Sequence, residues 1–278
     1  HRRKWLTRHS AISFSGTNTC EQTVTMSFKD KVVIVTGASS GIGAATAVSF
    51  AGQGANVVLV ARNQAKLDNV TSLCFEAGKK PLVINADVVK EEDAKRIIEE
   101  TLKAYGKIDV LVNNAGKNTT VTFGSQDTMA ALDDVMTLNY RAVVHLTYLA
   151  LPYLLQSQGN IINVSSIAST KTFPNGWAYC PSKAAVDSFT KSLALELGPK
   201  GVRVNAVNPG PVKTDIIDNM GIPGSVSDKV WESMKAMTAL HRVSETQEVA
   251  DVILFLASDK ARGVTASRWI TDNGAQAM

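Results

Sequence analysis

Tyr179 and Lys183 stand four residues apart, and Ser166 lies thirteen residues before Tyr179. On a helix, residues i and i+4 share one face, so the phenol and the ammonium point into the same space. A phenol has a reference pKa of about 10, and a neighbouring cation lowers that pKa toward the range useful for proton transfer. Pro181 suits a helix that begins near Ala178, because its missing N–H has no partner in a first turn. The pair also arises by chance on amphipathic helices, so its meaning depends on the rest of the chain.

The segments that position these residues alternate between short β-branched runs and longer helical stretches. Continuous apolar runs are typical of parallel strands covered on both faces. We expect strands at 31–36, 56–60, 81–85, 108–112, 160–164, 202–207 and 268–271. We expect helices at 42–53, 64–77, 91–105, 127–156, 178–197 and 246–257. This order predicts an α/β fold of the Rossmann type, doubly wound, with a seven-stranded parallel sheet and helices on both faces.

Residues 27–278 show no break in composition and no internal repeat, so we expect a single dinucleotide-binding catalytic domain. Residues 213–243 form a longer connection with two glycines and a proline near its start, which favours a lid. The first 25 residues are rich in Arg, Ser and Thr, and we expect them to be a poorly ordered extension. They resemble either an added segment before Met26 or a mitochondrial transit peptide.

The charge and the cysteines exclude several classes of function. The formal charge of +4 divides into +3 over residues 1–25 and +1 over the remainder, so nothing global indicates nucleic-acid binding. The three cysteines are widely spaced and form no CxxC, which indicates neither a disulfide framework nor a metal site. No apolar run is long enough to span a membrane. These features favour the cytoplasm, or the mitochondrion if the leader is a transit peptide.

A glycine-rich turn follows the first expected strand. Glycines there let the backbone turn tightly and approach a pyrophosphate, while the start of the next helix offers N–H donors and a favourable dipole. Three glycines alone are a weak signal, but the strand–turn–helix context at the first crossover strengthens it and predicts a nucleotide site. The residues expected to contact the cofactor in this turn are Gly37, Ser39, Ser40, Gly41, Ile42 and Gly43.

The end of the second strand discriminates between cofactors. An acidic residue there would bind the ribose 2′-hydroxyl of NAD, but the chain has Arg62 and Asn63. A guanidinium suits a 2′-phosphate, so we expect NADP(H) to be preferred, with NAD(H) as the alternative. Arg62 as a merely solvated strand-end charge is the other interpretation.

Two further strand ends lie where an open α/β sheet places its ligand. Asp87 and Val88 follow the third strand, and we expect them near the adenine ring. Asn114, Ala115 and Gly116 follow the fourth strand, where glycine permits close approach of the backbone to the cofactor.

Taken together, the motifs resemble the short-chain dehydrogenase/reductase family, especially its 3-oxoacyl-carrier-protein reductase-like and carbonyl reductase-like members. The resemblance covers about residues 27–274. Its supports, in family order, are the Thr36-Gly-x-x-x-Gly41-x-Gly43 turn, Asp87, Asn113-Asn-Ala-Gly116, Asn139, Ser166, Tyr179-x-x-x-Lys183 and Asn208-Pro-Gly-Pro-Val-Lys-Thr214.

The resemblance implies a role for each catalytic residue. Ser166 would bind the substrate carbonyl oxygen, and Tyr179 would exchange a proton with it. Lys183 would lower the pKa of Tyr179 and bind the nicotinamide ribose, and Asn139 would hold a water that connects Lys183 to solvent. Thr214 would hold the nicotinamide carboxamide. Further cofactor contacts are implied for Pro209, Gly210 and Val212.

The chain departs from the family pattern at three glycine positions. It has Thr265-Ala266 where relatives carry Thr-Gly, Asp272-Asn273-Gly274 where they carry Asp-Gly-Gly, and His241-Arg242 where Gly-Arg is common. These changes bear on subunit packing and lid geometry. By analogy with the family, the last strand and the helices that begin at 127 and 178 form interfaces, so we expect a homotetramer or homodimer.

Phe173 and Trp177 lie between Ser166 and Tyr179, and this position favours an apolar or bulky substrate. We therefore expect an NADP(H)-dependent oxidoreductase that reduces an apolar ketone or a 3-oxoacyl group to the alcohol. An NAD-linked alcohol or polyol dehydrogenase is the alternative enzyme, and a non-catalytic nucleotide-binding sensor or scaffold is the alternative of another class. The four histidines have no metal spacing, and no metal is expected.

Overall fold

Seven strands of the computed structural model, which describes residues 27–214 and 224–278, form one sheet in the order β3-β2-β1-β4-β5-β6-β7. Every neighbouring pair is parallel. The strands are β1 (Val32–Thr36), β2 (Asn56–Ala61), β3 (Leu82–Asn85), β4 (Val110–Asn113), β5 (Asn160–Val164), β6 (Arg203–Pro209) and β7 (Arg268–Thr271). The strand order reverses direction between β1 and β4, so the predicted doubly wound Rossmann-type fold is confirmed.

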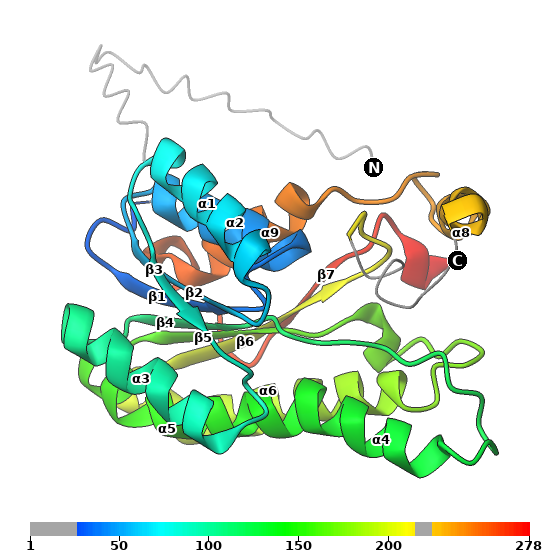
Figure 1. Cartoon of the computed structure of the whole chain (residues 1–278), viewed down its shortest axis with the longest axis horizontal. Coiled ribbons are helices and arrows are strands. Elements are labelled where there is room, and N and C mark those ends of the chain that lie inside the picture. The colour runs from blue at the N-terminus through cyan, green and yellow to red at the C-terminus, as the bar shows by residue number, and fades with distance from the viewer. Residues whose placement is uncertain (1–26, 215–223) are drawn as a thin grey trace, which may run out of the picture.

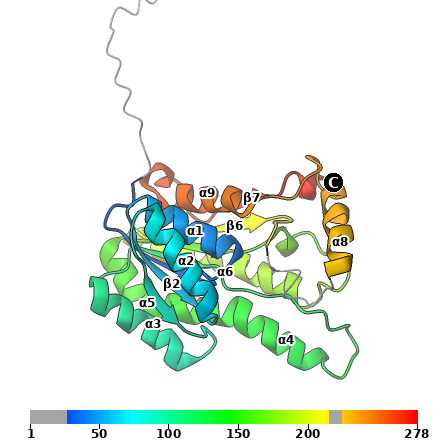
Figure 2. The ribbon, with the colours of Figure 1, turned by 45° about the horizontal axis from the view of Figure 1, so that its top comes forward.

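Helices cover both faces of the sheet, as Figure 1 shows. One layer contains α1 (Gly41–Gly52), α2 (Gln64–Ala77) and α9 (Thr246–Ala257). The other contains α3 (Glu91–Tyr105), α4 (Thr128–Met136), α5 (Ala142–Ser157) and α6 (Tyr179–Leu197). The turned view in Figure 2 keeps these two layers apart and shows α8 (Gly224–Ala236) beside the C-terminus, beyond the sheet.

Each strand contributes side chains to both layers because successive residues of a strand point to opposite faces. In β1, Val33 and Val35 join the buried cluster under α1, α2 and α9. Val32 and Ile34 join the cluster under α3, α5 and α6. Burying one such side chain stabilises the fold by about 1.5–3 kcal/mol. A strand buried on both faces therefore has the continuous apolar sequence from which the parallel sheet was predicted.

One long helix predicted over 127–156 is interrupted in the structure. A π-helical turn, η1 (Thr137–Arg141), separates α4 from α5. The turn contains Asn139, whose side chain is fully buried. The hydrogen bonds of the Asn139 side chain to distant residues explain why the helix changes to a π-helical turn here. The hydrophobic pattern of the sequence does not reveal this change. By contrast, α6 begins at Tyr179 as expected, with Pro181 in its first turn.

Two predicted segments lie wholly or partly outside the described residues. The extension 1–25 is outside them, and the lid 213–243 is described only from residue 224 onward and at its first two residues. Within the described parts, no helix combines the length and apolar character needed to cross a bilayer. The same parts contain no group of three or more His, Cys, Asp or Glu residues arranged to hold a metal ion.

Candidate active site

The four predicted catalytic residues come from three neighbouring parts of the fold. Ser166 follows the carboxyl end of β5, Tyr179 and Lys183 occupy the first turns of α6, and Asn139 lies in η1. A Cβ built on Gly116, just after β4, would lie 3.3 Å from Asn139 Oδ1 and 3.4 Å from Lys183 Nζ. The structure therefore brings Asn139 and Lys183 together beside a glycine at the edge of the sheet where open α/β folds place their ligands.

Ser166 lies beside Tyr179. Its hydroxyl acts on the phenol as a hydrogen-bonding group that lowers the pKa of Tyr179. Ser166 Oγ also accepts from the backbone N–H of Ala168 at 3.1 Å and lies 3.4 Å from the carbonyl oxygen of Pro209. Tyr179 as a whole is half-buried. Two neighbouring hydroxyls can bind one substrate oxygen between them.

Lys183 is held by the backbone and by the ring of Tyr179. Its Nζ donates to the carbonyl oxygen of Val164 at 2.8 Å and lies 5.6 Å from the centroid of the Tyr179 ring. The side chain is 5% exposed. An ammonium over an aromatic face is stabilised by the ring quadrupole, which offsets part of the cost of burial.

Asn139 ties η1 to the segment after β4. Its Oδ1 accepts from the backbone N–H of Lys117 at 2.9 Å, and its Nδ2 donates to the Lys117 carbonyl at 2.8 Å and to Ser182 Oγ at 3.0 Å. Both ends of the amide are engaged by the protein. The side chain thus fixes the loop that passes Lys183.

Burial displaces the two ionisable groups in opposite directions. It raises the pKa of Tyr179 to about 12, although the hydrogen bond from Ser166 acts to lower it. Burial lowers the pKa of Lys183 to about 8, although the charge of Asp187 acts to raise it. The expected depression of the Tyr179 pKa is not present in this structure, because loss of water around the phenolate outweighs the favourable contacts.

The glycine-rich turn between β1 and α1 accepts no side chains at its key positions. A Cβ on Gly43 would lie 2.3 Å from the Gly37 carbonyl oxygen, and one on Gly37 would lie 2.8 Å from Asn114 Nδ2. Gly37 and Gly41 also have φ values of 64° and 56°. Ser40 caps α1 without a side-chain hydrogen bond, and the first turn of α1 has no acidic residue. A helix start with N–H donors and no competing anion fits a pyrophosphate.

Thr36 and Asn114 clamp this turn to the end of β4. Thr36 Oγ1 accepts from the backbone N–H groups of Asn114 at 2.9 Å and Ala115 at 3.1 Å. Asn114 Nδ2 donates back to the Thr36 carbonyl at 2.9 Å. These reciprocal bonds hold the predicted cofactor residues of two strands in one fixed arrangement.

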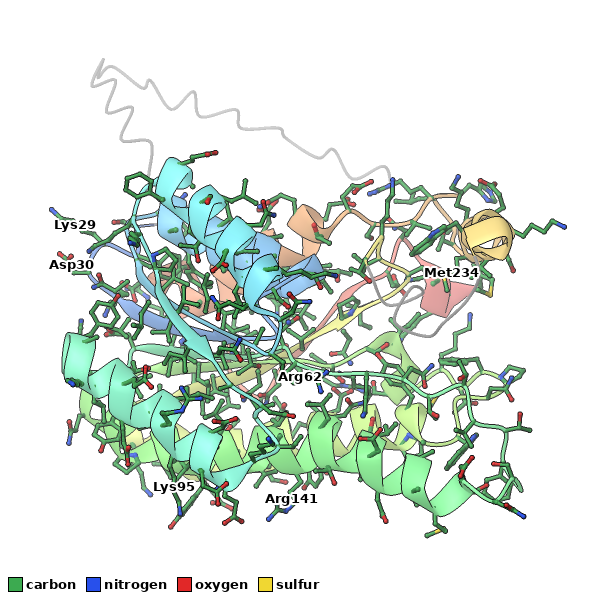
Figure 3. The ribbon with its side chains drawn as sticks, viewed as in Figure 1. Lys29, Asp30, Arg62, Lys95, Arg141 and Met234 are labelled. Carbon is green, nitrogen blue, oxygen red and sulfur yellow. The ribbon has the colours of Figure 1, made fainter. Side chains whose placement is uncertain are left out.

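Arg62 extends from the end of β2 into solvent, with 71% of its side chain exposed (Figure 3). Its Nη1 lies 3.8 Å from Asp87 Oδ2, so the two predicted cofactor residues are neighbours. Val88 beside them is buried. Asn63 caps α2 by accepting from the Lys66 N–H at 3.0 Å. The long contact to Asp87 leaves the guanidinium with donors to spare for an anion.

The segment after β6 closes the site from the other side. A Cβ on Gly41 would lie 3.1 Å from Thr214 Cγ2, which places Thr214 against the glycine-rich turn. Gly210 packs on Asp272, where a Cβ would approach to 2.7 Å, and Val212 forms a bridge with Ser244. The structure therefore brings the predicted residues of this segment, including Pro209 beside Ser166, to the carboxyl edge of the sheet.

Aromatic side chains line the rim beside Tyr179. The Phe173 ring centroid lies 6.5 Å from that of Tyr179. Trp177 turns to a different neighbour, because its Nε1 donates to the Val121 carbonyl at 2.9 Å and its ring meets Phe123 edge-on at 5.5 Å. Phe123 is 72% exposed and was not among the predicted site residues. Its loop has no periodic pattern, so only the tertiary contact with Trp177 reveals its place.

A doubly wound sheet with a glycine-rich first turn and a Ser–Tyr–Lys group at its carboxyl edge defines a class of α/β oxidoreductase. Residues 37–276 match the sequence model of a family described as enoyl-(acyl carrier protein) reductase. A 3-oxoacyl-[acyl-carrier-protein] reductase from Thermotoga maritima is 37% identical over 258 residues, which cover 90% of this chain and 99% of that protein. A 7alpha-hydroxysteroid dehydrogenase from Bacteroides fragilis is 34% identical over 252 residues, covering 89% and 95%.

A solved structure leads to the same family. A short-chain dehydrogenase/reductase of unknown function from Caenorhabditis elegans, crystallised with cofactor, superposes with a TM-score of 0.86 at 35% identity. The match covers 90% of this chain and 97% of that chain. The chain therefore belongs to the short-chain dehydrogenase/reductase family and is an oxidoreductase. The resemblance seen in the sequence motifs is confirmed.

Proposed function

We propose that this oxidoreductase reduces an apolar ketone or a 3-oxoacyl group to the alcohol with NADPH. The observation that carries the proposal is the placement of Lys183 Nζ 5.6 Å from the Tyr179 ring on α6, with Ser166 beside the phenol. The names of the relatives from Thermotoga maritima and Bacteroides fragilis, which refer to oxoacyl and steroid substrates, agree with a carbonyl or alcohol centre. The aromatic rim, made of the exposed Phe123 and Phe173 and the half-buried Trp177, supports an apolar substrate.

The chain's own residues would divide the work as follows. Ser166 donates a hydrogen bond to the substrate oxygen and stabilises the charge that develops there. Tyr179 gives that oxygen a proton, and its raised pKa keeps the proton in place at neutral pH until it is needed. The positive charge of Lys183 stabilises the resulting phenolate, and Asn139 lies on the same side of Gly116 as the ammonium. When bound, the nicotinamide supplies the hydride.

The nucleotide would lie across the carboxyl edge of the sheet. The α1 N-terminus would hold the pyrophosphate, Arg62 the 2′-phosphate, and Asp87 with Val88 the adenine side. Thr214 and Asn114 flank the turn from opposite sides. We further propose a cytoplasmic homotetramer or homodimer, since the buried free thiols of Cys74 and Cys180 suit a reducing compartment.

The test of this function is NADPH oxidation with a panel of ketones, quinones, steroids and 3-oxoacyl thioesters, in the wild type and in Tyr179→Phe. We expect kcat to fall about 10²- to 10⁴-fold in the variant, the range for loss of a general acid, while NADPH affinity is retained. Tyr140→Phe is the matched control, because Tyr140 in η1 packs edge-on against Phe189 of α6. A Tyr179→Phe variant with wild-type turnover would refute the assignment.

A further inference from the structure

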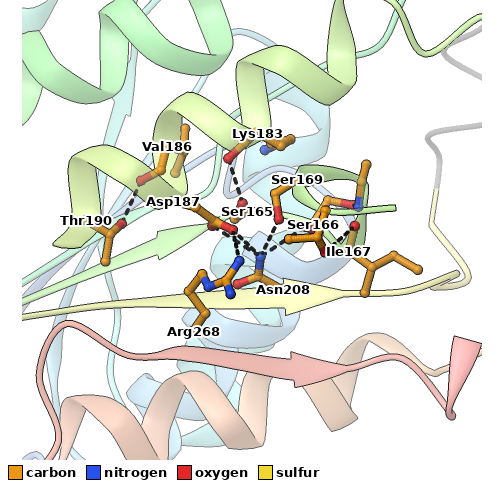
Figure 4. A network of polar contacts seen from close by, with 12 residues as sticks. Ser165, Ser166, Ile167, Ser169, Lys183, Val186, Asp187, Thr190, Asn208 and Arg268 are labelled. Atoms are coloured by element: carbon orange, nitrogen blue, oxygen red, sulfur yellow. Dashed lines mark hydrogen bonds and ion pairs between the residues drawn. The ribbon is translucent and has the colours of Figure 1, made fainter. Parts of the chain in front are cut away.

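Asp187 is a buried carboxylate to which the proposed chemistry gives no role. It lies on α6 one turn beyond Lys183 and is 5% exposed. Two groups from other strands reach it, as Figure 4 shows. Asn208 Nδ2 on β6 lies 3.1 and 2.9 Å from its two oxygens, and Arg268 Nη1 on β7 lies 3.3 Å from Oδ2. Burying a carboxylate is costly unless it is paired, and here β6 and β7 each supply a partner for it.

Asn208 connects the carboxylate to Ser166. The same Nδ2 that faces Asp187 lies 3.0 Å from the Ser166 carbonyl oxygen and 3.0 Å from Ser169 Oγ. Asn208 Oδ1 is buried and has no hydrogen-bond partner among the described residues. The Asn208 amide is therefore oriented with its nitrogen toward Asp187 and Ser166, although this leaves its oxygen without a hydrogen bond. A carboxylate accepts hydrogen bonds only, which fixes the amide in this orientation.

Asp187 also acts on Lys183. Residues i and i+4 share a helix face, and the negative charge of Asp187 raises the pKa of Lys183 against the effect of burial. The backbone of the same turn is tied to the end of β5, since Ser165 Oγ donates to the Lys183 carbonyl at 3.2 Å. One carboxylate is thus connected by a hydrogen-bonded path to Ser166 and by its field to Lys183.

We propose that Asp187 is a positioning residue, which orients Ser166 through Asn208 and supports the charge of Lys183, while Arg268 moderates its field. This inference rests on the proposed roles of Ser166 and Lys183 in carbonyl reduction. Two titratable or charged side chains face the pair directly: the Tyr179 ring, whose centroid lies 5.6 Å from Lys183 Nζ, and Arg268, whose Nη1 lies 3.3 Å from Asp187 Oδ2. Cys180 is the further titratable neighbour of Tyr179 on α6.

The first variant is Asp187→Asn, which removes the charge and keeps the shape. The matched control is Asp109→Asn, because Asp109 is also 5% exposed and binds cations, Lys31 at 3.3 Å and Lys107 at 2.9 Å, at the opposite end of β4. Titration of Lys183 is followed by NMR in protein labelled with ¹³C at lysine Cε, with Lys183→Arg to identify the signal. This readout requires neither cofactor nor substrate.

We expect Asp187→Asn to lower the titration midpoint of Lys183 by about one pH unit, the effect of losing a nearby opposite charge. We expect kcat for the fastest carbonyl of the panel to fall at least about tenfold, because Ser166 loses its fixed backbone. Asp109→Asn should reduce thermal stability and change neither quantity. Equal midpoints and equal kcat values in the two Asn variants would overturn the proposal.

Arg268→Met provides a test of opposite sign, useful also if Asp187→Asn does not fold. Removing this cation leaves the field of Asp187 uncompensated, so the Lys183 midpoint should move to higher pH. An unchanged or lowered midpoint contradicts the proposal. The proposed function is judged separately: if Tyr179→Phe remains active, the catalytic assignment fails. If that variant is inactive while Asp187→Asn behaves as Asp109→Asn does, only the inference about Asp187 fails.

Discussion

Tyr179 and Lys183 respond to the same burial in opposite ways, and this sets the pH range of the proposed reaction. With pKa values of about 12 and about 8, the phenol keeps its proton at neutral pH while the ammonium loses its proton first as the pH rises. Reduction needs both protons, so kcat/KM for reduction should be level below pH 8 and fall above it. Stopped-flow NADPH oxidation between pH 6 and 10 measures this.

Lys183→Arg is the informative companion to that profile. An arginine stays charged throughout this pH range, so the fall above pH 8 should disappear even though the rate is lower. A wild-type profile that is level to pH 10, or an identical fall in the arginine variant, contradicts the assignment of the titration to Lys183.

Arg62 is the residue that we expect to determine whether NADPH or NADH binds more tightly. A guanidinium that is 71% exposed and 3.8 Å from Asp87 has donors available for a phosphate. In Arg62→Gln the net loss of one charge-assisted bond, worth about 1.5–3 kcal/mol, should weaken NADPH binding about 10- to 100-fold and leave NADH binding nearly unchanged. Fluorescence titration of each nucleotide measures this.

Arg141→Gln is the matched control for Arg62→Gln. Arg141 lies in η1, its side chain is 59% exposed, and it also pairs with an acidic residue, Glu91. Both arginines are labelled in Figure 3. Tighter binding of NADH than NADPH by the wild type would remove Arg62 from its proposed role.

At the scale of elements, the three departures from the family pattern share one backbone feature. His241, Ala266 and Asn273 all have positive φ values, 50°, 57° and 53°, in the left-handed region that favours glycine. For a residue with a Cβ this conformation costs roughly 1–2 kcal/mol, whereas asparagine tolerates it better. At all three positions the backbone of this chain has the conformation that glycine adopts most easily.

His241→Gly should therefore stabilise the protein. The imidazole is exposed, so its removal costs little packing energy. Relief of the backbone strain outweighs the larger conformational entropy that glycine loses on folding, and the free energy of unfolding should rise by about 0.5–1 kcal/mol. Urea unfolding measures it. Asn273→Gly is the contrasting variant, because Asn273 Nδ2 donates to Ser244 Oγ at 2.8 Å and to the Arg242 carbonyl at 3.3 Å. It should gain nothing or lose stability, and a larger gain there than at His241 would refute this account.

The elements that the sequence predicted best are those whose ends are set locally. Helices α2, α3 and α9 begin and end at the predicted residues, because Asn63 caps one, Gly106 ends another in a left-handed conformation, and Glu245 with Glu248 forms a capping box at the third. The break between α4 and α5 depends on the contact of Asn139 with a loop 22 residues away. No local pattern contains that information.

The candidate site divides in the same way. Its motif residues were predictable because each is fixed by a turn, a strand end or an i,i+4 spacing. Asp187 repeats the i,i+4 spacing from Lys183, so the sequence held a signal for it, but Asn208 and Arg268 reveal its importance only through the sheet order β5-β6-β7. Phe123 depends on an edge-on contact 54 residues along the chain, which spacing does not encode.

For the whole molecule, the elements expected to form subunit interfaces each expose a large apolar side chain. Met129 on α4 is 63% exposed, Leu195 on α6 is 76% exposed and Ile270 on β7 is 50% exposed. Strand β7 is also the edge of the sheet, with one side unpaired among the described strands. Apolar side chains on an edge strand and on adjoining helices favour association into a symmetric oligomer.

Light scattering coupled to gel filtration should accordingly give the mass of a homotetramer or homodimer of the 29.7 kDa chain. Leu195→Glu and Ile270→Lys, which place charges at those interfaces, should each reduce that mass at micromolar concentration, because burying an unpaired charge opposes association. Phe75→Glu is the matched control, since Phe75 is 65% exposed on α2, outside the expected interfaces. A monomeric wild type, or a mass that falls in Phe75→Glu but not in the other two, would show that these exposed side chains serve another purpose.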